Sequence, residues 1–136
     1  MSIELCREDG VYEGGCELTA NWRISRVTLD CLSAIEVSVL WFTEGKGDTD
    51  LNVHYFERLE KEQIHRHGLA DQQSLSCVLP ATPLSYHGRL IRLRWSVRLR
   101  LFMTNGREIV TNQPFYLVAV NSSQNGLTAI RSSDCP

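Results

Sequence analysis

The sequence lacks any apolar run near the roughly 20 residues that a membrane-spanning helix requires. Its first residues, 1 to 9, include acidic side chains where a secretory signal would be basic and then apolar. The cysteines form no CxxC pair, and an odd number cannot all pair within one chain; they are Cys6, Cys16, Cys31, Cys77 and Cys135. We therefore expect a cytoplasmic protein with no membrane span, in which most cysteines are small buried hydrophobes.

The signatures of common enzymes are also missing. The glycines of segment 44–48 do not form a phosphate-binding loop, and Ser85 does not stand in a Gly-x-Ser-x-Gly elbow. No cysteine or carboxylate spacing completes a metal site around the four histidines, which are His54, His65, His67 and His87. We expect no enzyme, no catalytic residue, no cofactor and no metal, and we keep a cryptic hydrolase using Ser85 and His87 as an alternative.

The composition is that of an ordinary soluble domain. The chain has 136 residues, of which 43% are hydrophobic and 22% are charged, enough to bury a core without metal or disulfide support. Its formal net charge of -2 gives no overall attraction to nucleic acid, so we expect no nucleic-acid partner. Any basic surface must be local.

Apolar and polar residues alternate along much of the chain. From Ile91 to Met103 the odd positions are apolar and the even positions carry four arginines, which predicts a long strand with one buried face and one arginine face. The dipeptide Asn105-Gly106 predicts a hairpin turn after it. Similar alternation predicts strands in segments 2–6, 16–24, 34–43, 75–79 and 108–120.

Two segments are ambiguous. Residues 27–32 fit either a strand or a loop. In residues 51–65 the first half alternates, whereas the second half is rich in helix-forming residues. We expect a strand there because a short helix would need an apolar stripe.

About seven or eight strands with regular turn signals and no βαβ pattern predict an antiparallel β-sandwich over 1–120, followed by a polar tail over 121–136. The expected core residues are Leu18, Trp22, Ile35, Val37, Val39, Val53, Leu79, Leu93, Trp95, Val97, Leu99 and Phe115. Four aromatic residues fall on the opposite faces of their strands, where they form either a second cluster or an exposed patch; these are Phe42, Phe56, Phe102 and Tyr116.

Two stretches together suggest a family. Gly15 and Leu18 open an early strand, and a Leu79-Pro80 pair is followed by the corner Pro83 to Tyr86, which leads into the arginine strand. This combination resembles the arrestin-like β-sandwich superfamily over about residues 10–118. The resemblance implies an immunoglobulin-like scaffold used for protein contacts, with no assigned chemistry. Arrestin-family proteins usually carry two such sandwiches, whereas this chain has room for one.

We therefore expect a non-catalytic protein-interaction or scaffolding module. Its expected partner-binding residues are the guanidinium groups of the arginine strand, which suit an acidic peptide or phosphate groups; they are Arg92, Arg94, Arg98 and Arg100. The alternative is that acidic residues on adjacent strands lie opposite these arginines and neutralise them as cross-strand pairs; the acids considered are Glu57, Glu60, Glu62, Glu108 and aspartates of those strands.

Two further readings stay open. A small-ligand or carbohydrate-binding module would require a concave pocket with aromatic residues and converging polar groups. Exposed sheet edges and the charged loop 44–50 are further contact sites, and an edge offers a route to a homodimer.

Overall fold

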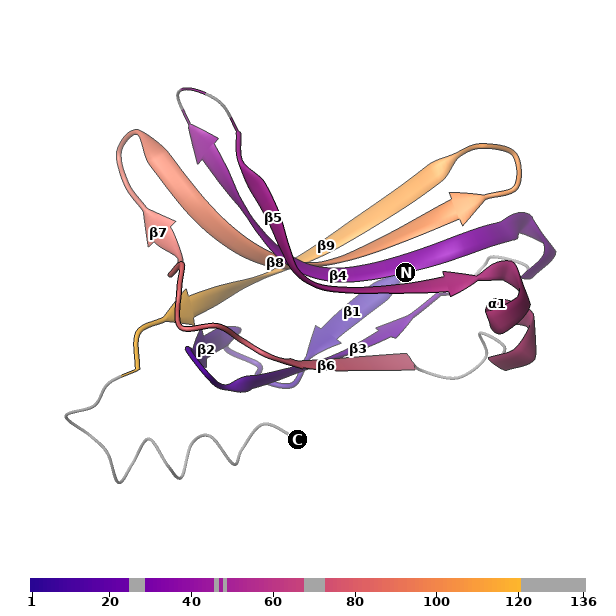
Figure 1. Cartoon of the computed structure of the whole chain (residues 1–136), viewed down its shortest axis with the longest axis horizontal. Helices are drawn as coiled ribbons and strands as arrows, with labels where there is room; N and C mark the ends of the chain where they lie inside the picture. Colours follow the sequence, from indigo (N-terminus) through magenta and orange to yellow (C-terminus); the bar gives the residue numbers. More distant parts are fainter. Residues whose placement is uncertain (25–28, 46, 48, 68–72, 121–136) are drawn as a thin grey trace.

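The computed structural model describes residues 1–24, 29–45, 47, 49–67 and 73–120, which form two packed β-sheets (Figure 1). The small sheet has the order β1-β3-β6 and consists of β1 (Ser2–Leu5), β3 (Glu17–Arg23) and β6 (Gln73–Val78). The large sheet has the order β2-β9-β8-β4-β5, with β7 beside β8. Its strands are β2 (Val11–Glu13), β4 (Leu32–Gly45), β5 (Leu51–Glu60), β7 (Tyr86–His87), β8 (Ile91–Met103) and β9 (Glu108–Val118). The tail expected over 121–136 lies outside the described residues.

These sheets confirm the predicted all-β sandwich. Each strand pair is antiparallel except β2–β9, which is parallel. Across the β8–β9 turn, the Met103 N–H donates to the Arg107 carbonyl at 2.8 Å and Gly106 has a φ of 89°, as the Asn-Gly signal predicts. The expected count of seven or eight strands omitted the two shortest, β2 and β7.

The core lies between the two sheets. Alternation directs Leu18, Ala20 and Trp22 of β3 inward against the odd positions of β8, which include the fully buried Trp95. The expected core residues are all buried except Val53 and Leu93. Leu93 is half-buried because it lies near the end of β8, where β9 no longer pairs with it.

Val53 is 50% exposed because a β-bulge shifts the register of β4 against β5. Val39 lies opposite Tyr55 and the next residue, Leu40, lies opposite Val53, so His54 of β5 has no counterpart. The extra residue exchanges the two faces of β5 beyond this point. Assigning Val53 to the core was therefore wrong.

Each of the two ambiguous segments contains two kinds of secondary structure. In residues 51–65 the alternating half forms β5, whereas Lys61–His67 form helix α1, so extending the strand to residue 65 was wrong. Ile64 supplies the buried contact that anchors this short helix. In residues 27–32, Leu29–Cys31 form a 3-10 turn and Leu32 begins β4, while residues 27 and 28 lie outside the described part.

The large sheet is strongly bent. Figure 1 shows β4, β5 and β8 bending near their middles, with the small sheet beneath, so that the outer face of the large sheet lies on the inside of the bend. Three residues of this outer face, Ser38, Leu40 and Ser96, are buried although they do not belong to the core cluster between the sheets. We call this surface the concave outer face.

The cysteines depart from the expectation. Cys16 and Cys77 are half-buried thiols and Cys31 is an exposed thiol. Cys6 is disulfide-bonded. Burial raises the pKa of Cys77 to about 11, and the nearby Glu17 carboxylate adds to this shift.

Candidate binding surfaces

The four arginines of β8 line the concave outer face. Arg92 and Arg94 precede Ser96, and Arg98 and Arg100 follow it. Ser96 pairs with Leu40 of β4, and both side chains are buried in the middle of the bent sheet. The arginines therefore flank a floor of small and apolar side chains from both sides.

Among the described residues, Arg94 alone of the four has a carboxylate partner: its Nε lies 2.9 Å from Glu44 Oε1, and both side chains are about half exposed. Arg98 Nε donates to the neutral amide oxygen Oδ1 of Asn112 at 2.8 Å. Arg100 Nε is buried without a hydrogen-bond partner, and Arg92 has no hydrogen bond or ion pair within the described part of the chain. Three of the four guanidinium groups thus have no carboxylate partner among the described residues.

Neighbouring arginines explain why carboxylates are not available. Glu36 lies opposite Arg100 in the register, yet its carboxylate binds Arg58 of β5, which also binds Glu60. Glu44 lies opposite Arg92 but pairs diagonally with Arg94. Glu57, Glu60, Glu62 and Glu108, which were considered as neutralising partners, form no ion pair with a β8 arginine in the described structure.

The pKa of Arg98 and the ring contacts of its neighbours fit a surface on which guanidinium charges lie close together. Burial lowers the pKa of Arg98, and the neighbouring Arg100 charge lowers it further. The guanidinium groups of Arg58 and Arg100 lie 5.3 and 5.9 Å from the centroid of the Phe102 ring, within cation–π range. An anion placed here would relieve the repulsion between Arg98 and Arg100.

The four outer aromatics split between the two expectations. Phe56 is 52% exposed and Tyr116 is 63% exposed, as a surface patch requires. Phe42 and Phe102 are half-buried, and Phe102 is covered by two arginines.

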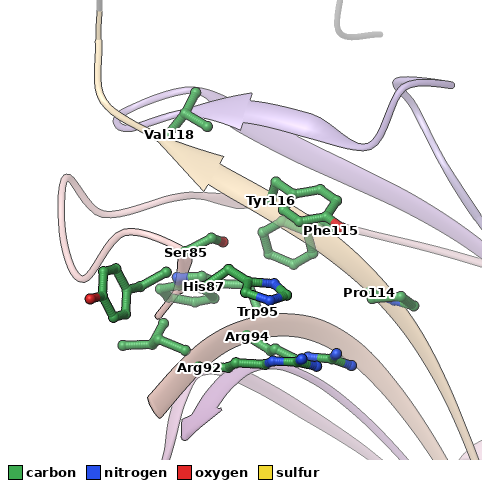
Figure 2. Close-up of a pocket in the computed structure, with 11 residues that line it drawn as sticks. Ser85, His87, Arg92, Arg94, Trp95, Pro114, Phe115, Tyr116 and Val118 are labelled. Carbon is green, nitrogen blue, oxygen red and sulfur yellow. The ribbon is translucent and has the colours of Figure 1, made fainter. Parts of the chain in front are cut away.

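A second surface lies at the edge of β8. Here β9 pairs with β8 up to the pair Trp95–Phe115, and β7 pairs with β8 at Leu93 and Arg92. A cavity of about 270 Å³ opens in the fork between β7 and β9 (Figure 2). We call it the fork pocket; its lining includes Tyr86, His87, Arg92, Trp95, Phe115 and Tyr116. Aromatic rings and the guanidinium groups of Arg92 and Arg94 line this cavity together.

The structure does not form the pair that a hydrolase would need. Ser85 Oγ accepts a hydrogen bond from the Leu117 N–H at 2.8 Å, and His54 Nε2 lies 2.7 Å from the Val78 carbonyl oxygen that it can bind. Among the described residues, no hydrogen bond joins a histidine to Ser85 or to a carboxylate, and no three metal-ligating side chains converge. His65 and His87 are exposed, and the His67 side chain lies outside the described part.

The sequence interpretation missed the fork pocket. A local signal was present, because Pro114 within a predicted strand indicates an interruption of the ladder. No local signal showed that β9 would leave β8 and join β2, where Tyr116 pairs with Val11, more than a hundred residues earlier in the chain.

No family model matches the sequence, and no curated protein matches it. Among solved structures, the chain is similar to the crystal structure of Spo0M, the sporulation control protein from Bacillus subtilis, with a TM-score of 0.54 and 13% sequence identity. The match covers 97% of this chain and 54% of the Spo0M chain, so this chain spans about half of that protein's length. Spo0M has an arrestin-like fold, and the likeness confirms an arrestin-like β-sandwich here without showing a shared function.

No helix in the described residues is long and apolar enough to cross a membrane.

Proposed function

We propose that this chain is a non-catalytic protein-interaction module that docks an acidic segment of a partner protein on its concave outer face. The observation that carries the proposal is the group of three uncompensated guanidinium groups, Arg92, Arg98 and Arg100, around a buried floor. Carboxylates of a partner would supply the charge-assisted hydrogen bonds that the glutamates of the sheet give to Arg58 and Arg94 instead.

The concave shape favours an extended segment over a flat protein surface. On the inside of a bend, side chains from both arms converge on a bound chain, so one segment reaches arginines on either side of Ser96. Arg98 and Arg100 are half-buried, which strengthens their interaction with an anion relative to fully solvated arginines. A cytoplasmic location and a homodimer through a sheet edge stay predictions.

The test compares two labelled peptides, hexaglutamate and hexaglutamine, by fluorescence anisotropy. We expect hexaglutamate to bind and its affinity to fall as the salt concentration rises. The double variant Arg98→Gln plus Arg100→Gln should bind this peptide about tenfold more weakly. Arg107→Gln, in the exposed β8–β9 turn, is the matched control and should bind as the native chain does. Equal binding of both peptides, or an unchanged affinity in the double variant, would contradict the proposal.

A further inference from the structure

The fork pocket is built by a change of neighbour along one edge of β8. Pro114 has no N–H to donate, and beyond Phe115 the backbone of β9 bonds elsewhere: the Tyr116 N–H donates to the Gly10 carbonyl at 2.8 Å. Between the β7 pairing at Leu93 and the β9 pairing at Trp95, β8 has no neighbour at Arg94 on this edge. The gap is therefore a consequence of the topology.

Both walls of the fork are held in place. The Ser85 N–H donates to the Leu117 carbonyl at 2.9 Å, and the Leu117 N–H donates to Ser85 Oγ at 2.8 Å. This double hydrogen bond ties the segment before β7 to β9. The pocket is pre-formed, so ligand binding would not incur the entropic cost of ordering its walls.

The pocket lies over an apolar layer of the core. The rings of Trp95 and Phe115 are both buried, with centroids 5.8 Å apart and an interplanar angle of 35°. The Trp95 Nε1–H donates to the Pro83 carbonyl at 2.7 Å, so it offers no donor to a ligand. Two further aromatic residues of the lining, Tyr86 and Tyr116, are 61% and 63% exposed. Figure 2 shows Tyr116 above Phe115 on β9. This lining suits a flat apolar ring.

One cation at the rim has no partner. Arg92 lines the pocket and forms no hydrogen bond or ion pair with any described residue, because Glu44 opposite it binds Arg94. Arg92 and Arg94 extend in the same direction along the rim in Figure 2. A carboxylate there would gain a charge-assisted contact with Arg92.

The size and chemistry of the pocket limit the ligand. A cavity of about 270 Å³ lies just below the range for small-molecule sites, roughly 300 to 1,000 Å³. A sugar would need several converging hydrogen-bonding groups, yet the Ser85 hydroxyl oxygen already accepts from the backbone. We propose that the fork pocket binds a small carboxylic acid with a flat apolar ring, the ring against the exposed Tyr86 and Tyr116 and the carboxylate on Arg92.

This inference concerns a different cavity and a different ligand from the docking of an acidic segment; Arg92 contributes to both sites, whereas Arg98 and Arg100 belong to the concave outer face alone. Phenylacetate is the probe, and its neutral counterpart phenylacetamide is the ligand control. An acid of this size, with about ten non-hydrogen atoms, should bind with a Kd on the order of 1 mM. Two-dimensional amide NMR should show phenylacetate shifting the signals of residues 85–87, 92–95 and 115–118.

Variants separate the two contacts. Arg92→Gln should weaken phenylacetate about tenfold and leave phenylacetamide unchanged, whereas Tyr116→Ala should weaken both. Arg107→Gln is the matched charge control and should change neither. The Arg98→Gln plus Arg100→Gln variant should also leave phenylacetate binding intact, which distinguishes this site from the concave outer face.

Three results would overturn the inference. They are the absence of shifts at 10 mM phenylacetate, which is about ten times the expected Kd; equal affinities for the acid and the amide; and an unchanged affinity in a folded Arg92→Gln variant.

Discussion

Two buried tryptophans allow the same substitution to be tested in opposite hydrogen-bonding states. Trp95 is fully buried and its Nε1–H donates to the Pro83 carbonyl, whereas Trp22 is 4% exposed and its buried Nε1 has no hydrogen-bond partner among the described residues. Replacing either residue with phenylalanine removes about three buried ring atoms, which costs roughly 2 kcal/mol of unfolding free energy in both variants.

The hydrogen-bonding contribution has opposite signs in the two variants. Trp95→Phe leaves the Pro83 carbonyl oxygen without its donor, which costs roughly 1 to 3 kcal/mol more. Trp22→Phe removes an unsatisfied buried N–H, whose burial costs a similar roughly 1 to 3 kcal/mol in the native protein. We therefore expect Trp95→Phe to lose about 3 to 5 kcal/mol and Trp22→Phe to be close to neutral.

Urea denaturation followed by far-ultraviolet circular dichroism measures both values, since this signal does not depend on the tryptophans removed. The slope with denaturant should stay constant, which shows that the change lies in stability and not in compactness. If Trp22→Phe destabilises the protein as much as Trp95→Phe, the reasoning from hydrogen-bond satisfaction is refuted.

Two further predictions concern single residues. Burial raises the pKa of Cys77 from 9.0 to about 11. At pH 8 its thiolate should therefore be roughly 100-fold scarcer in the folded than in the unfolded chain. Alkylation followed by mass spectrometry should show that Cys77 reacts more slowly in the folded chain by a similar factor. The folded state favours the neutral thiol, so the contribution of Cys77 to the free energy of unfolding is complete below pH 9 and is lost as the pH rises to about 11. Unfolding midpoints that do not fall over this pH interval would contradict the raised pKa. A Cβ at Gly45, where φ is 141°, would overlap the Leu90 carbonyl oxygen, whereas a Cβ at Gly106, where φ is 89°, would meet no atom within 4 Å. Gly106→Ala should therefore cost roughly 1 kcal/mol and Gly45→Ala clearly more, as measured by thermal unfolding; equal costs would exclude the clash as the cause.

The long strand β8 and its hairpin were predictable because their signals are local. Side-chain direction alternates along any extended backbone, so the pattern from Ile91 to Met103 indicated which residues would be buried before the partner strands were known. The Asn105-Gly106 turn is similarly encoded by the ability of glycine to adopt a positive φ.

Prediction failed where one extra residue in a strand exchanged the two faces on which its side chains lie. The pattern of Leu51, Val53 and Tyr55 placed these residues on one face, but the bulge at His54 transfers Val53 to the outer face. The bulge is a property of β4 and β5 together, and the sequence of β5 alone does not show it.

The candidate sites depend even more on tertiary structure. The sequence by itself determined that β8 would carry four arginines on one face, because an alternation of period two is a property of a single extended chain. Only the tertiary structure decided which of them would keep their charge: Arg58 reaches Glu36 from another strand, and Arg94 rather than Arg92 binds Glu44. The fork pocket likewise exists because β9 leaves β8 to pair with β2. Ion pairs and cavities are set by the register and order of strands distant in sequence, and no local pattern encodes those.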